Sequence, residues 1–229
     1  MDKAEHQHRS IRSFVRREGR LTRAQSRALD QYWPRYGIDF SGEVLDINTL
    51  FGRRAPLVVD IGVGTGDSTL QHALQHPDNN YLAIEVHRPG VGHLLNEMGN
   101  QHISNIRVIN HDVIPVLGKL IPAGSVSQVF IFFPDPWPKK RHHKRRLINA
   151  ELLGLLQKIL ARNGRLHIAT DWEDYAEHIE AVFSNSPAFY NLATNAGFAP
   201  RPAWRTHTRY EARGTRLHHN VRDFCYCLV

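Results

Sequence analysis

The chain has 229 residues, of which 41% are hydrophobic and 22% charged, a composition typical of a globular protein. It contains no run of about 18 apolar residues, which excludes a membrane-spanning helix, and its first ten residues lack the apolar stretch of a secretory signal. Its two cysteines cannot form a disulfide framework, so we expect a cytoplasmic protein in reducing surroundings.

The net charge of +7 is concentrated in three segments. Residues 1–35 carry nine Lys and Arg against four Asp and Glu, residues 139–146 carry six basic residues and no acid, and residues 201–222 carry six Arg against one Glu. The remaining chain is acidic, which favours a polyanionic partner bound by particular regions. Two alternatives stay open: each run is a solvated surface, or 139–146 is a nuclear-localisation signal.

Residues 1–56 differ from the rest of the chain. An Arg-rich helical stretch is followed by the sequence WPRYG at 33–37 and then by a loop that reaches Pro56. We expect this part to be a basic N-terminal extension, partly flexible, rather than a second domain.

From residue 57 onward, short β-rich runs alternate with helical patterns, which predicts βαβ units and an α/β fold with a largely parallel sheet. The expected strands are 57–61, 81–86, 106–110, 126–133, 165–170 and 221–229. The expected helices include 67–75, 151–161 and 172–183, the last capped by Asp171. In the closing strand Cys225 and Cys227 share a face, where we expect them to pack rather than to bind a metal. Residues 57–229 are expected to form one domain.

A glycine-rich turn follows the first expected strand. Gly62, Gly64 and Gly66 have the spacing G-x-G-x-G, whereas dinucleotide-binding turns have G-x-G-x-x-G. Asp60 precedes the turn, and a carboxylate there would repel a pyrophosphate but suit a sulfonium or ammonium group. The order acid-x-Gly-x-Gly-x-Gly resembles the first motif of class I S-adenosylmethionine methyltransferases, which implies S-adenosyl-L-methionine as cofactor. The alternative is a structural turn with a capping acid.

Two further acids follow expected strands. Glu85 ends the second strand, 19 residues after Gly66, where an acid would accept hydrogen bonds from both ribose hydroxyls of a nucleoside. NAD-dependent enzymes share this acid, so it does not discriminate between cofactors. Asp112 follows the third strand, and in this fold an acid at that strand end hydrogen-bonds the adenine amino group. An exposed loop acid would look the same in sequence.

The block FFPDPWPKKRHHKRR at 132–146 carries the most specific signal. It begins at the carboxyl end of the fourth expected strand, where open α/β sheets place reactive groups. Prolines on both sides of Asp135 hold its carboxylate on a stiff turn. Trp137 offers a stacking surface for a base, and the basic run offers phosphate contacts. The alternative for Asp135 is a turn-forming acid between two prolines.

Together with the glycine turn, this block resembles the bacterial tRNA (guanine-N7-)-methyltransferase family. ATDWEDYA at 169–176, TRYEARG at 208–214 and WPRYG at 33–37 also match that family, and the resemblance extends from about residue 20 to residue 229. It implies a Rossmann-like class I methyltransferase fold, with a mostly parallel seven-stranded sheet, helices on both faces and an antiparallel C-terminal strand. It also implies methyl transfer from S-adenosylmethionine to N7 of the variable-loop guanine, position 46 of tRNA.

The resemblance assigns a role to each matching position. Asp135 is the catalytic residue and also contacts the cofactor. The cofactor-binding residues are Asp60, Gly62, Gly64, Gly66, Glu85 and Asp112. The substrate-binding residues are Lys139, Asp171, Thr208, Arg209, Tyr210 and Glu211. The RNA-binding residues are Arg141, His142, His143, Lys144, Arg145 and Arg146.

The chemistry can be reasoned separately. Guanine N7 has an in-plane lone pair and no proton, so methylation there needs no general base. It needs orientation of the base and stabilisation of the positive charge that develops on it. A fixed carboxylate at Asp135 could accept from guanine N1–H and N2–H and offset that charge. N7 lies in the groove of an A-form helix that side chains cannot reach, so we expect a loop or splayed base as target.

Fifteen histidines raise the question of a metal, but His142-His143 and His218-His219 are adjacent pairs that point apart, so no metal is expected. The expected partner is tRNA, and the protein is a monomer or homodimer. Three alternatives remain: a class I methyltransferase with another RNA base or a small molecule as substrate, a non-catalytic RNA-binding protein, and an NAD-dependent oxidoreductase.

Overall fold

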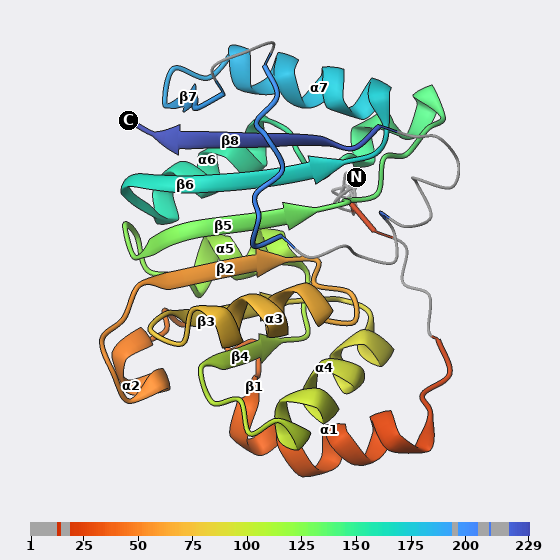
Figure 1. The fold of residues 1–229 in the computed structure, drawn as a ribbon, viewed down its shortest axis with the longest axis vertical. Helices are drawn as coiled ribbons and strands as arrows, with labels where there is room; N and C mark the ends of the chain where they lie inside the picture. The colour runs from red at the N-terminus through yellow and green to blue at the C-terminus, as the bar shows by residue number, and fades with distance from the viewer. Residues whose placement is uncertain (1–12, 15–18, 194–196, 206–210, 212–219) are drawn as a thin grey trace, which may run out of the picture.

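A computed structural model of the chain describes residues 13–14, 19–193, 197–205, 211 and 220–229 (Figure 1). Its strands are β1 Gly37–Ile38, β2 Leu57–Ile61, β3 Asn80–Ile84, β4 Ile106–Ile109, β5 Val126–Phe132, β6 Leu160–Thr170, β7 Phe189–Asn191 and β8 Arg222–Leu228. Its helices are α1 Arg23–Tyr36, α2 Ile47–Phe51, α3 Asp67–Gln75, α4 Arg88–Asn100, α5 Val113–Lys119, α6 Ala150–Ile159 and α7 Glu173–Ser184, with a 3-10 helix, η1, at Lys140–Arg145.

The strands form one sheet in the order β1-β4-β3-β2-β5-β6-β8-β7. The neighbouring strands from β1 to β6 run parallel, and β8 pairs antiparallel with both β6 and β7. The predicted α/β fold, with its mostly parallel sheet and antiparallel C-terminal strand, is confirmed. An eighth strand, the two-residue β1, extends the sheet beyond β4, and it is too short to give a pattern in the sequence.

Helices cover both faces of the sheet, as side chains on the strands alternate. In β2 all five residues are buried: Val59 and Ile61 pack in a core formed with α5, α6 and α7, whereas Val58 packs with α1, α3 and α4 on the other face. A strand that is buried on both faces requires a continuous apolar run, which explains the pattern at 57–61.

Helix α1 packs against α4 through the apolar face that includes Ala28 and Leu29. Thr22 begins α1 with a reciprocal capping box, because its hydroxyl accepts from the Gln25 N–H and the Gln25 side chain accepts from the Thr22 N–H. The first helical turn is thereby stabilised without tertiary contacts.

Helix α7 starts one residue later than predicted. Asp171 is not its N-cap: Trp172 occupies that position with extended backbone, and no side chain caps the helix. The Trp172 N–H instead donates to the Thr170 hydroxyl oxygen, 3.3 Å away, because β6 continues to Thr170 and the chain turns directly into the helix. No helix within the described ranges is long and apolar enough to cross a membrane.

Candidate active site

The site residues predicted from the sequence gather at one edge of the sheet. Strands β3, β2, β5 and β6 are parallel neighbours, so their carboxyl ends meet at the edge where the arrowheads of β2, β5 and β6 lie in Figure 1. The chain order reverses between β2 and β5, and ligands bind at such a switch point in open α/β sheets. Asp60 and Glu85 lie on one side of it, and Asp135 and Asp171 on the other.

Asp60 lies near the end of β2 and is 3% exposed. Its carboxylate accepts a hydrogen bond from the Thr69 hydroxyl at 2.7 Å, from the first turns of α3. Burial raises the pKa of the Asp60 carboxyl to about 7, and the neighbouring charge of Glu85 raises the pKa further, against the hydrogen bond from Thr69. A cation beside Asp60 would restore its charged form.

The glycine turn needs residues that tolerate left-handed backbone. Gly62 and Gly64 have φ of +76° and +59°, and Gly66, at +81°, caps the N-terminus of α3 without a side chain. A Cβ at Gly62 or Gly64 would meet no atom within 4 Å, so the turn faces open space. The turn can therefore approach a ligand with its backbone, next to the free N–H groups of α3.

Glu85 directly follows β3, and its carboxylate connects two backbone segments. One oxygen accepts from the Gly64 N–H and the other from the His87 N–H, both at 2.7 Å. Burial raises the pKa of the Glu85 carboxyl, although these hydrogen bonds act in the opposite direction. Each carboxylate oxygen has a second lone pair, so Glu85 can still accept from a diol.

Asp112 caps α5, with one carboxylate oxygen accepting from the Ile114 N–H at 3.2 Å. Its neighbour His111 stacks on Phe40 with ring centroids 4.2 Å apart. A cavity of about 450 Å³ opens beside Asn110, and its lining includes Trp33 and Pro34 of the predicted family segment. The N-terminal part of the chain thus lines this cavity together with Arg88 and Asn110, which the sequence pattern did not predict.

The Asp135 turn is bracketed by two strained residues. Phe133 and Trp137 have φ of +52° and +47°, which is uncommon for bulky side chains and typical of functional turns. The Phe133 N–H donates to the Ala169 carbonyl at 2.8 Å, which joins the turn to β6. Asp135 itself is exposed. Its carboxylate is thus held on a stiff backbone while its surface faces solvent.

The basic run forms η1, with Lys139 as its N-cap. Lys139, Arg141 and Lys144 are exposed, whereas His142 and His143 are half-buried. One face of Trp137 is occupied in this structure, since the Arg145 guanidinium lies 5.0 Å from the ring centroid. A base could stack on that face only after Arg145 moves.

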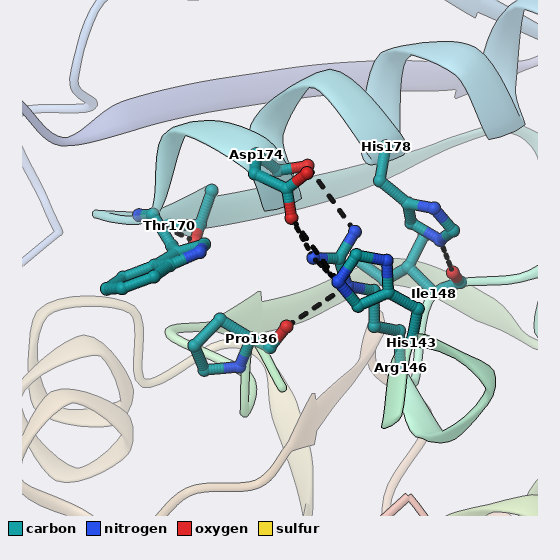
Figure 2. A network of polar contacts seen from close by, with 8 residues as sticks. Pro136, His143, Arg146, Ile148, Thr170, Asp174 and His178 are labelled. Carbon is teal, nitrogen blue, oxygen red and sulfur yellow. Dashed lines mark hydrogen bonds and ion pairs between the residues drawn. The ribbon is translucent and has the colours of Figure 1, made fainter. Parts of the chain in front are cut away.

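Arg146 departs from the prediction that it contacts RNA. Its side chain is 2% exposed and points inward, toward the carbonyl of Pro136 and the carboxylate of Asp174 (Figure 2). A run of six basic residues looks uniformly solvated in sequence, but the turn after η1 directs this last arginine into the protein.

Of the remaining predicted residues, Asp171 and Glu211 are described. Asp171 is half-buried directly after β6, whereas Thr208, Arg209 and Tyr210 fall outside the described residues. Glu211 is described and is 3% exposed. Its carboxylate is held by two nitrogens of Arg205 at 2.9 and 3.0 Å.

Comparisons with known proteins agree with this geometry. Residues 54–224 match the profile of a family described as "Putative methyltransferase". A protein of Hydrogenovibrio crunogenus named tRNA (guanine-N(7)-)-methyltransferase is 48% identical over 225 residues, which cover 98% of this chain and 93% of the relative. One of Nitrosospira multiformis with the same name is 51% identical, covering 96% and 95%. The chain belongs to the tRNA (guanine-N7-)-methyltransferase family.

Solved structures place this family member among methyltransferases by fold alone. The 16S rRNA methyltransferase KamB superposes with a TM-score of 0.54 at 12% identity, covering 81% of this chain and 94% of KamB. An antibiotic-related methyltransferase gives 0.54 at 16% identity, covering 83% and 94%. No cluster of three or more His, Cys, Asp or Glu within the described part of this tRNA (guanine-N7-)-methyltransferase family member could hold a metal ion.

The sequence missed Arg205 and Asp223 as parts of the site in this family member. Arg205 is fully buried, and its Nε lies 2.8 Å from an oxygen of Asp223, on β8. An acid within the apolar strand 221–229 was the available signal, because a buried carboxylate requires a partner.

Proposed function

We propose that this chain transfers a methyl group from S-adenosylmethionine to N7 of a guanine in tRNA, the variable-loop guanine at position 46. The observation that carries the proposal is the switch point between β2 and β5. There a buried acid, a glycine turn and Glu85 lie at the carboxyl ends of β2 and β3, and the stiff turn that carries Asp135 follows the neighbouring β5. The family and the motifs at 132–146 and 169–176 support tRNA as the substrate.

The residues on the β2–β3 side fit the cofactor. Open space at Gly62 and Gly64 leaves room for a ligand against the backbone. The buried Asp60 carboxylate would hold a cationic group, and Glu85 would accept from the ribose hydroxyls. Asp112 would accept from the adenine amino group with the oxygen that does not cap α5. S-adenosylmethionine supplies an electrophilic methyl group when bound.

Asp135 would orient the guanine and need not take up a proton. Its carboxylate accepts from N1–H and N2–H and offsets the positive charge that appears on the methylated base. Lys139, Asp171 and Thr208 to Glu211 would bind the substrate around it, and the exposed residues of η1 would contact phosphates. At saturating S-adenosylmethionine, where the bound cation keeps Asp60 charged, a flat profile of kcat against pH between about pH 5 and pH 8 fits this role, and a kcat that follows an ionisation near neutrality contradicts it.

The partner and the organisation of the chain follow from the same proposal. The basic N-terminal part of the chain would add RNA contacts to the methyltransferase domain of residues 57–229, onto which α1 and β1 pack. The protein would modify its tRNA substrate in the cytoplasm, as a monomer or homodimer.

The activity is tested with tRNA from cells that lack 7-methylguanosine. The purified protein and S-adenosylmethionine are incubated with this tRNA, which is then digested to nucleosides for mass spectrometry. We expect new 7-methylguanosine, reduced by about 100-fold or more in Asp135→Asn because the neutral amide loses the charge that offsets the developing cation. Glu43→Gln, an exposed residue before α2, serves as the matched control and should leave the yield unchanged.

Two outcomes would contradict the proposal. Formation of a different methylated nucleoside would mean that the protein is a methyltransferase that acts on another base. Tight tRNA binding without any methylation would favour a non-catalytic RNA-binding protein.

A further inference from the structure

Arg146 joins two segments that the proposed function places in the active site. Its Nε donates to the Pro136 carbonyl at 3.0 Å, directly after Asp135. One terminal nitrogen donates to the Asp174 carboxylate, in the first turn of α7 and three residues after Asp171. Figure 2 shows the guanidinium between these two groups.

The surroundings of Arg146 fix its side chain. The guanidinium carbon lies 5.0 Å from the ring centroid of Tyr175, and the same terminal nitrogen is 3.2 Å from Nε2 of His143. The Tyr175 hydroxyl accepts from the Ile148 N–H at 3.2 Å, and the His178 ring is bonded to the Ile148 carbonyl at 2.8 Å. These two bonds attach the chain just after Arg146 to α7 independently of the Arg146 side chain.

The contact with Pro136 has a consequence for Asp135. Proline has no N–H, so its carbonyl is the only backbone group through which residue 136 can be held. Holding it fixes the peptide plane between Pro136 and Trp137, where the backbone already has a left-handed φ at Trp137. Burial raises the pKa of the Tyr175 hydroxyl, on α7, to about 12, and the charge of Asp135 adds a smaller contribution in the same direction.

We propose that Arg146 is a positioning residue, which sets the Asp135 turn and the Asp171 end of α7 at their working separation. This inference rests on the proposed function, because that function assigns roles to Asp135 and Asp171. Arginine suits the task, since its planar fork donates in several fixed directions. Lysine carries the same charge but could hold the Pro136 carbonyl or the Asp174 carboxylate, not both.

The experiment compares Arg146→Lys and Arg146→Met with the unaltered protein. Steady-state methylation gives kcat and KM for tRNA, and tRNA binding is measured over a range of salt concentrations. We expect kcat to fall about 10-fold for lysine and about 100-fold for methionine, since misplaced reacting groups cost rates of this order. The Kd for tRNA and its salt dependence should stay unchanged.

Two control variants separate the alternatives. Lys144→Gln, two residues earlier and exposed, should weaken tRNA binding and lower the salt slope by about 0.7–0.9, as expected for one lost phosphate contact. Ile159→Val, in the core at the end of α6, should lower Tm by a few degrees and leave kcat unchanged. An Arg146→Met protein with the signature of either control would overturn the inference.

Hydrogen exchange provides a readout that does not depend on activity. In Arg146→Lys, exchange should rise together in peptides that cover 133–145 and 171–175, and stay unchanged in β2, β3 and β4. Unchanged exchange, or a uniform rise across the protein, would overturn the inference. Absence of methylation by the unaltered protein would instead overturn the proposed function, and the exchange data would still decide whether Arg146 couples the two segments.

Discussion

The Asp60 carboxyl is buried beneath the glycine turn with one neutral hydrogen-bond donor, the Thr69 hydroxyl. Its folded-state pKa of about 7 lies above the ordinary value of 3.8, so the folded protein holds this proton more tightly than the unfolded chain does. The contribution of Asp60 to stability is therefore complete below about pH 4 and is lost as the pH rises through about 7.

The upward shift of the Asp60 pKa gives a prediction for the ligand-free protein. The contribution of Asp60 to the free energy of unfolding should fall between about pH 4 and pH 7, and the difference between the unaltered protein and Asp60→Asn should change over that range by at most about 4 kcal/mol for a shift of this size. Urea unfolding at several pH values measures it. Glu43→Gln should follow the pH profile of the unaltered protein. A profile for Asp60→Asn that parallels the unaltered protein would show that Asp60 is charged throughout.

At the scale of elements, the non-helical segment 197–205 covers one face of β5 and β6. This blue segment crosses in front of β8, β6 and β5 in Figure 1. Trp204 stacks on Phe130 of β5 with ring centroids 4.8 Å apart and meets His167 of β6 edge-on. Burial lowers the pKa of His167 to about 4, so this contact stays uncharged near neutral pH. Arg205 then fastens the end of the segment to Asp223.

Removal of Arg205 should destabilise the protein strongly. Arg205→Met leaves the carboxylates of Glu211 and Asp223 buried without their cation, which costs about 3–5 kcal/mol when one partner of a buried pair is lost. Burial already raises the pKa of the Asp223 carboxyl, so protonation at pH 5 should recover part of the loss. Urea unfolding at pH 8 and pH 5 measures both effects.

Arg201 supplies the matched control for that experiment. It lies 3.4 Å from the same Glu211 carboxylate, but its side chain is 35% exposed whereas that of Arg205 is fully buried, so Arg201→Met should cost less than Arg205→Met, about 1 kcal/mol. Equal losses for the two variants would mean that the buried pairs of Arg205 add nothing beyond a surface contact.

At the scale of the whole molecule, the exposed cations of η1, Lys140, Arg141 and Lys144, lie just after the Asp135 turn, while the chain outside the three basic segments is acidic. The double variant Lys140→Gln/Lys144→Gln should lower the slope of log K against log salt for tRNA binding by about 1.4–1.8. Lys119 and Lys158 end α5 and α6, at the opposite edge of the sheet, and their double Gln variant should leave the slope unchanged. Equal slopes for both double variants would contradict a localised RNA surface.

The sequence predicted most of the sheet and the places of Asp60, the glycine turn and Glu85 at its carboxyl edge, because local pattern determines both. Continuous apolar runs mark buried parallel strands, and an acid followed by spaced glycines marks a turn against a ligand. The inward direction of Arg146 depends on Asp174, and the burial of Arg205 depends on Asp223; these pairs meet only in the folded chain. The N-cap of α7 was misplaced because β6 runs on to Thr170.

Strand β8 lies between β6 and β7, yet it is the last of the strands to be synthesised. While the chain is still emerging from the ribosome, β6 has an open edge and β7 has no neighbour to pair with. Asp223 is also absent until then, so Arg205 and Glu211 lack their anchor. The part around β2 and β3, which we propose binds the cofactor, can form early, whereas the part around β6 and β8 is completed only with the final strand. A nascent chain would therefore acquire the proposed substrate-binding half last.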